Sequence, residues 1–298
     1  GDEFKPVSSF KLAQLPGDVM QPKAKAKRKI KGISSTDVDL IISEINRSEV
    51  VLRTRGIVEP VLQDLIDKFG ADVINEIGIR QNFIRNSRVE QFLHDRTGAL
   101  ITAINDTTQS RLQDVMQEGL DNGDTAEQIA ETIGSLFDDF AGVRADMIAQ
   151  TESTLLAGFS SQEAIQQSGI DKKEWLTTMD GRARDTHLAL DGQVVDTQGD
   201  FKSPSGDEAP YPGGFATAAE NINCRCATAA VIDTNDGKSI KARTPDERKA
   251  LWEAREAKRK KAENVLSVMA RDIFKAQYNV VIDRYRVITG LHMKPTSH

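Results

Sequence analysis

Two cysteines and one histidine carry the most reactive side chains of this sequence. Cys224 and Cys226 are its only cysteines, and one residue separates them in the segment Asn-Cys-Arg-Cys that begins at Asn223. His187 lies upstream in a charged segment. Thiolates and imidazoles bind zinc, and together they can also act as a nucleophile and its base. The residue types leave three alternatives open: a zinc site, a catalytic pair, and a packing role with His187 hydrogen-bonded to a carboxylate or carbonyl.

The spacing of the two cysteines argues against the zinc site. Zinc sites usually have roughly two to four residues between paired cysteines, so a gap of one is tight for two ligands of one ion. Asp180 or Asp185 would have to supply a fourth ligand. The sequence therefore favours a packing role without a cofactor, and it keeps one set of candidate zinc ligands: His187, Cys224, Cys226 and Asp180. Cysteines this close do not form a relaxed disulfide, which fits synthesis in a reducing cytoplasm.

The segment around the histidine is rich in charges of both signs. They are Asp180, Arg182, Arg184, Asp185 and Asp191. Paired arginines can bind a phosphate or carboxylate. Because acids and bases nearly balance, we expect instead a set of internal salt bridges that fixes this loop beside Glu152.

The two segments resemble motifs of the Mu F-like head morphogenesis family, the minor head proteins of tailed bacteriophages. The family pattern W-L-t-t-x-D-x-R-[ST]-R-x-x-H-x-x-L-[DN]-G is followed tens of residues later by N-C-R-C. The residues that match are Trp175, Leu176, Asp180, Arg182, Arg184, His187, Leu190, Asp191, Gly192, Asn223, Cys224, Arg225 and Cys226. Ala183 replaces the usual Ser or Thr, and Gln150 stands where an Arg is expected in an upstream helix. The resemblance covers roughly residues 124–233.

This resemblance implies a minor head protein that acts in capsid assembly, bound at the portal vertex, in a virion assembled in the host cytoplasm. The implied partners are the portal protein, capsid or scaffolding protein, and packaged double-stranded DNA, with roles in DNA packaging and ejection and no membrane contact. The alternative is an enzyme delivered with the DNA, either similar to ADP-ribosyltransferases or a thiol-dependent hydrolase. No Ser nucleophile elbow, Walker A segment or convincing transferase set is present, so we expect no enzyme activity.

Charge distribution separates one end of the chain from the rest. The 298 residues carry a formal net charge of −6, which argues against DNA binding by the whole molecule. A basic run without acids nevertheless provides candidate DNA contacts at Lys23, Lys25, Lys27, Arg28, Lys29 and Lys31. Such a run can neutralise phosphates. No apolar stretch has the length of a membrane span or signal peptide. Because the chain begins with Gly, we expect that a preceding segment was removed.

The elements that must position these residues are mostly helices. We predict an α+β fold, predominantly helical, with a disordered basic arm over residues 1–32 and a helical bundle or stalk over 33–123. A small α+β domain with a pinned long loop follows over 124–236, and a helical extension over 237–298. Strand patterns occur only at 174–179 and 227–232. The Gly- and Pro-rich connection between them predicts no regular structure.

Helix signals place the boundaries. Ser34 to Asp37 offer N-caps for a first helix, and Pro60 suits the first turn of the next. Asp124 or Thr125 is expected to cap a helix after a break at Gly123. A helix over 142–168 should end at Gly169, and Thr244-Pro245-Asp246-Glu247 is a capping box. The predicted apolar stripe of the last helix is Leu251, Ala254, Val265, Met269 and Ile273, and Lys258 to Lys261 are expected on a solvated face.

Overall fold

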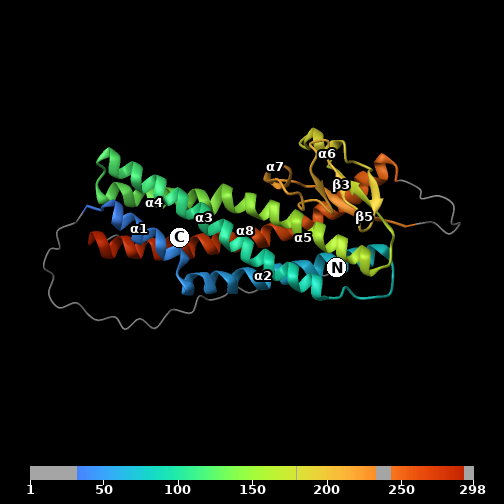
Figure 1. Ribbon diagram of the computed structural model, residues 1–298, viewed down its shortest axis with the longest axis horizontal. Helices are drawn as coiled ribbons and strands as arrows, with labels where there is room; N and C mark the ends of the chain where they lie inside the picture. Colours follow the sequence, from blue (N-terminus) through green and yellow to red (C-terminus); the bar gives the residue numbers. More distant parts are fainter. Residues whose placement is uncertain (1–31, 179, 233–242, 292–298) are drawn as a thin grey trace. The chain divides into compact units, whose positions relative to one another are not determined.

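The chain is described by a computed structural model that covers residues 32–178, 180–232 and 243–291 (Figure 1). The predicted basic arm lies outside the described residues, except for Gly32. The candidate DNA contacts from Lys23 to Lys31 are therefore not described. Two compact units divide the chain. Unit 1 takes the described parts of Gly1–Val51, Ala103–Asp139 and Phe274–His298, and unit 2 takes Leu52–Thr102 and Phe140–Ile273. Each unit is therefore assembled from segments far apart in the sequence.

The fold class is confirmed, because the chain is mostly helical with small antiparallel sheets. The longer helices are α1 (Ser35–Ser43), α2 (Ser48–Ile77), α3 (Ser87–Asn122), α4 (Ala126–Asp139), α5 (Ala145–Gln167) and α8 (Pro245–Thr289). A 3-10 turn, η1 (Glu44–Asn46), precedes α2, and a π-helical turn, η2 (Phe140–Arg144), precedes α5. The short elements are β1 (Lys172–Leu176), α6 (Asp185–Leu188), β2 (Val194–Asp196), β3 (Phe201–Lys202), β4 (Glu208–Ala209), α7 (Ala218–Asn221) and β5 (Ala227–Val231). None of the described helices is long and apolar enough to span a membrane.

Several helix ends lie where the sequence predicts them. Ser34 caps α1 in a capping box with Asp37. The backbone N–H of Thr125 donates to the side-chain carbonyl of Gln128. The backbone N–H of Gln128 in turn donates to the Thr125 hydroxyl. Thr244 and Glu247 make the same exchange before α8. These side chains satisfy amide groups that have no partner within the helix.

The expectation for Pro60 is wrong. Pro60 lies in the interior of α2, not in the first turn of a helix. A proline there lacks the amide hydrogen of the ladder, and its ring approaches the carbonyl of Gly56. The helix continues because Val58, Leu62 and Leu65, on either side of the proline, are all buried. Burial of this face outweighs a local cost of about 3 kcal/mol.

The predicted buried face of α8 is also partly wrong. Ala254 is exposed, whereas Trp252, Glu256 and Arg259 are buried. Arg259 lies within the predicted solvated run, but its guanidinium pairs with Glu256 and lies 3.0 Å from Glu263. A buried ion pair of this kind does not appear in hydrophobic periodicity, which registers only apolar side chains.

A three-stranded sheet in unit 2 has the order β2-β1-β5. Each predicted strand region contains a strand, although β1 begins two residues before the predicted start and ends at Leu176. The two strands pair antiparallel with Trp175 opposite Thr228 and Leu176 opposite Ala227. The predicted absence of regular structure between them is wrong, because this connection contains β2, β3, β4, α6 and α7. These elements have two to four residues each, too few to leave a periodic pattern.

The sheet is packed on both faces. Leu176 and Ala229 pack with Trp252 of α8, while Ala230 packs with Ile165 of α5 and with side chains of α2. Figure 1 shows the strands gathered with α6 and α7 next to α5 and α8. The loop connections after β1 and before β5 are therefore held against long helices.

Candidate functional site

The Asn-Cys-Arg-Cys segment is fixed to α5 through its backbone. Asn223 has a φ of 57°, a left-handed conformation that asparagine tolerates better than most residues. Its amide donates to the Thr151 hydroxyl at 3.2 Å, and its carbonyl accepts from Gln150 at 3.0 Å. The hydroxyl of Thr154 donates to the carbonyl of Cys224. Gln150, the departure from the family pattern, thus takes part in holding the motif.

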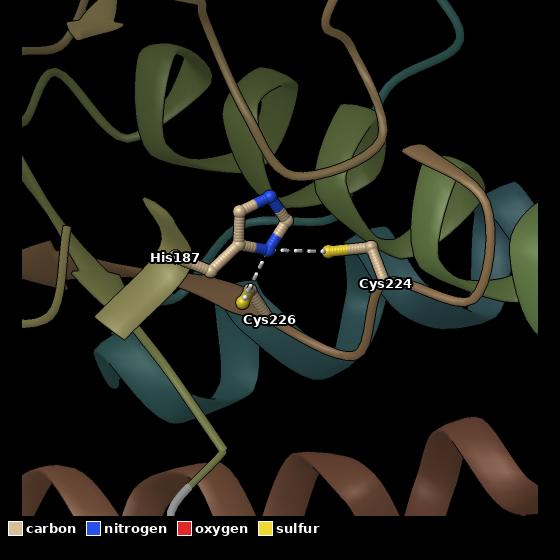
Figure 2. Close-up of side chains that lie close together, drawn as sticks. All are labelled: His187, Cys224 and Cys226. Carbon is tan, nitrogen blue, oxygen red and sulfur yellow. Dashed lines mark hydrogen bonds between the residues drawn. The ribbon is translucent and has the colours of Figure 1, made fainter. Parts of the chain in front are cut away.

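The two cysteines and the histidine form one buried cluster. Nδ1 of His187 lies 3.6 Å from Sγ of Cys224 and 3.5 Å from Sγ of Cys226. Figure 2 shows the Nδ1 edge of the ring turned toward both sulfur atoms. Both cysteines are free thiols, as their spacing predicts. Exposure is 1% for Cys224, 4% for Cys226 and 2% for His187, so the cluster is shielded from solvent.

Glu220 of α7 completes the cluster, and no motif or spacing in the sequence points to this residue. Its Oε2 lies 2.9 Å from Nε2 of His187, on the opposite edge of the ring from the sulfurs. Thr186 donates a hydrogen bond of 3.0 Å to the same carboxylate. Glu220 is 6% exposed. Its role depends on how a four-residue helix packs, and spacing from the cysteines could not have revealed it.

The pKa values of Cys224, Cys226 and His187 are shifted by burial and by neighbouring groups of the cluster. A hydrogen bond from Cys226 holds the pKa of Cys224 well below the ordinary thiol value, against the effect of burial, and His187 lowers it further. Burial raises the pKa of Cys226 well above its ordinary value. For His187, burial alone would lower the pKa, but Cys224 and Glu220 together raise it. The cluster therefore favours negative charge on one sulfur.

Aromatic rings enclose the cluster. The indole of Trp175 lies edge-on to the His187 ring with centroids 5.8 Å apart, and Phe215 stacks on the imidazole at 5.7 Å. Phe201 packs against Trp175 at 5.1 Å. These contacts remove the imidazole from water and fix the orientation of its plane.

Asp180 lies apart from this cluster as a partner of arginines. Arg225 makes two hydrogen bonds to its carboxylate, at 2.6 and 2.8 Å, and Arg182 makes another at 2.8 Å. The bond from Arg225 is the main reason that the pKa of Asp180 falls well below its ordinary value. Among the described residues, the group with metal-ligand geometry consists of His187, Cys224 and Cys226, without Asp180. Asp185, the other candidate fourth ligand, is exposed.

The remaining charges of the first motif also hold the loop. Asp191 accepts from the amide of Thr177 at 2.9 Å and pairs with Arg248 of α8 at 2.9 Å. Gly192 has a φ of 76°, and a Cβ there would lie 3.0 Å from the Arg248 guanidinium. The guanidinium of Arg184 donates to the carbonyl of Ile222.

Glu152 does not join these contacts. It pairs instead with Arg96 of α3. The expected internal salt bridges are thus present, but Glu152 lies in a different pair from the loop.

Comparison with known proteins agrees with the motifs. Residues 110–229 match the family described as Phage Mu protein F like protein. The chain is 37% identical over 110 residues to an NAD(+)--arginine ADP-ribosyltransferase of Enterococcus faecalis, a match that covers 36% of this chain and 22% of that protein. It is 30% identical over 133 residues to minor head protein GP7 of Bacillus phage SPP1, covering 43% of this chain and 42% of that protein.

A further relative, the uncharacterized protein YqbB of Bacillus subtilis, is 24% identical over 200 residues, which cover 65% of this chain and 64% of that protein. The chain thus spans less than two thirds of the length of each of these relatives. No solved structure matches the chain significantly. The segment 110–229, which contains both the Trp175 and the Asn223 motifs, matches the Phage Mu protein F like family.

Proposed function

We propose that this chain is a minor head protein that acts in phage capsid assembly, bound at the portal vertex of the head. The observation that carries the proposal is the family match over residues 110–229, together with the similarity to a minor head protein of phage SPP1. The portal protein is the expected principal partner. Capsid or scaffolding protein and packaged double-stranded DNA are further expected partners.

The use of the motif residues supports a structural role. Asp180 pairs with Arg225, and Asp191 pairs with Arg248, so these charges act within the chain. Arginines engaged in this way have fewer donors left for a phosphate or a substrate. The motif residues accordingly stabilise the loop between β1 and β5.

One similarity favours an enzyme instead, namely the match to an ADP-ribosyltransferase. That match covers only 22% of the longer protein, so it need not include the part that its name describes. A thiol-dependent hydrolase is the other alternative. His187 lies between Cys224 and Glu220 in space, as a base lies between a nucleophile and the acid that orients it. The 1% exposure of Cys224 disfavours it, since a substrate would reach the sulfur only after the enclosing rings moved.

Co-purification tests the proposal. The full-length chain and the portal protein encoded in the same genome are expressed together, and complexes are isolated through the portal. We expect the chain to elute with portal rings, and to transfer no label from radiolabelled NAD⁺ to arginine-containing acceptors. Failure to associate with portal or assembled heads, or transfer of the label, would overturn the proposal.

We further propose that the helices, not the Cys-x-Cys region, make the contact with the portal. Exposed apolar side chains on helical segments are suited to docking on a partner. Leu52, Val143 and Val287 are 67%, 79% and 71% exposed. Each residue is replaced with Glu in turn, and at least one of these variants should co-purify less with the portal. The control variant Cys226→Ser, at a buried position, should co-purify as the wild type does if it folds. The reverse pattern would place the contact at the Cys-x-Cys region.

A further inference from the structure

We propose that Cys224, Cys226 and His187 bind a zinc ion that fixes the loop after β1 to the segment before β5. This inference is independent of the role in phage heads. It reverses the preference drawn from spacing, because the structure shows how two cysteines separated by one residue reach the same point.

The cysteine side chains lie on one side of the backbone. In an extended chain, residues i and i+2 face the same way and the residue between them faces the other. Cys224 and Cys226 both approach His187, while the intervening Arg225 reaches Asp180. The one-residue gap is therefore compatible with two ligands.

The distances match those of a tetrahedral metal site. With Zn–S of about 2.3 Å and Zn–N of about 2.0 Å, a tetrahedral angle places sulfur and nitrogen about 3.5 Å apart. The two sulfur–nitrogen distances are 3.6 and 3.5 Å, and the three ligand atoms all lie within 4.8 Å of one another. One ion can thus contact all three atoms with little movement.

The orientation of the histidine is the second argument. Without a metal, Nδ1 has only one lone pair or one N–H to offer, although two sulfur atoms lie within 3.6 Å of it. A metal bound to Nδ1 would satisfy that nitrogen and both sulfurs together. Nε2 meanwhile lies 2.9 Å from Oε2 of Glu220, which is an ion-pair distance. Metal-bound histidines characteristically donate their other ring N–H to a carboxylate or carbonyl.

The described residues supply three ligands, and the fourth position falls to water or another small ligand. Asp180 is engaged by Arg182 and Arg225 and lies outside the cluster.

Metal content tests the proposal directly. The full-length chain without a histidine tag is expressed in zinc-supplemented medium, purified without chelators, and assayed by elemental analysis. We expect about one zinc per chain. Removing the metal with a chelator should lower the melting temperature, and returning zinc should restore it, because a ligand that binds only the folded state stabilises it.

Variants identify the ligands. Cys224→Ser, Cys226→Ser and His187→Gln should each lose most of the zinc, whereas His94→Gln, which changes an exposed histidine, should retain it. If a ligand variant does not fold, cobalt replaces zinc in the intact chain. Thiolate-to-cobalt charge transfer with strong tetrahedral d–d absorption would support the site.

Three results would overturn the proposal. The first is folded wild-type protein that neither contains nor takes up zinc or cobalt. The second is full zinc retention in both folded cysteine variants, and the third is loss of zinc from the His94 variant alone. The first result would favour a metal-free thiolate–imidazolium pair, which would leave Cys224 readily alkylated once the domain opens.

Discussion

At the scale of single residues, the roles of the motif side chains follow from their partners. Asn223 provides a left-handed turn, Gly192 leaves space for Arg248, and Asp180 receives Arg225. A sequence shows that such residues occur together but not which of them touch. The structure assigns each one a contact that holds the loop between β1 and β5.

Glu220 is predicted to position His187 for zinc binding. Glu220→Gln removes the charge that faces Nε2 but keeps the size of the side chain, so the ring loses part of its orientation and basicity. We expect zinc affinity to fall about 10–100-fold, measured by competition with a chromophoric chelator. Glu208→Gln, which changes an exposed acid paired with Lys202, is the matched control. Equal zinc affinities in the two variants would show that Glu220 does not contribute to zinc binding.

Lys173 is predicted to make stability rise with alkaline pH. It is fully buried, its ammonium donates to Gln162 and to the carbonyl of Pro210, and burial lowers its pKa to about 8. Below pH 8 the lysine is charged in both states and the cost of burying that charge is fully present. Between pH 8 and its ordinary pKa of 10.5, the unfolded chain binds more protons, so the free energy of unfolding increases with pH.

Urea unfolding at several pH values checks this effect. As the pH rises above 8, we expect the free energy of unfolding of the wild type to increase relative to that of Lys173→Met, by up to about 1.4 kcal/mol per pH unit. The comparison cancels titrations elsewhere in the chain. A difference that stays constant from pH 8 to 10 would mean that the lysine keeps an ordinary pKa.

At the scale of elements, buried side chains override local signals. Pro60 signals the start of a helix, yet α2 passes through it because apolar residues before and after the proline share one buried face. The same competition explains α8, where the buried face includes Arg259 with its acidic partners. Tertiary burial determines the limits of these elements more than propensity does.

Pro60→Ala is predicted to stabilise the protein. Alanine restores the amide hydrogen of the helix and removes the ring from the carbonyl of Gly56, so the free energy of unfolding should rise by up to about 3 kcal/mol. Arg53→Ala, at another exposed position of α2, should change it by no more than about 0.5 kcal/mol. Chemical denaturation measures both. Loss of stability in the alanine variant would show that α2 requires the proline in its native geometry.

At the scale of the whole molecule, the net charge of −6 and the basic run at Lys23–Lys31 have opposite effects on the affinity for DNA. The acidic remainder repels DNA, so any attraction should come from the run.

Removing residues 1–32 is predicted to abolish most binding to double-stranded DNA at low salt. Each phosphate contact contributes about −0.9 to the slope of log affinity against log salt, so the intact chain should show a steep slope and the truncated chain a shallow one. Electrophoretic mobility shifts measure both. A full-length variant with the six basic residues changed to Gln separates charge from length, and it should behave like the truncation. Undiminished binding by either variant would locate DNA contact elsewhere.

The helical class, the capped starts of α1, α4 and α8, the two paired strands and the family motifs can all be read from the sequence alone. These features depend on local signals, namely capping side chains, periodicity and residue order. Local signals extend over a few residues and are readable without knowledge of the fold.

The composition of the site, by contrast, depends on tertiary packing. It brought Glu220 to His187, separated Asp180 from the cysteines, and assembled each compact unit from distant segments. These outcomes depend on how elements of two to four residues pack between long helices. Such elements are too short to specify their own structure, so their positions follow from burial against the rest of the chain.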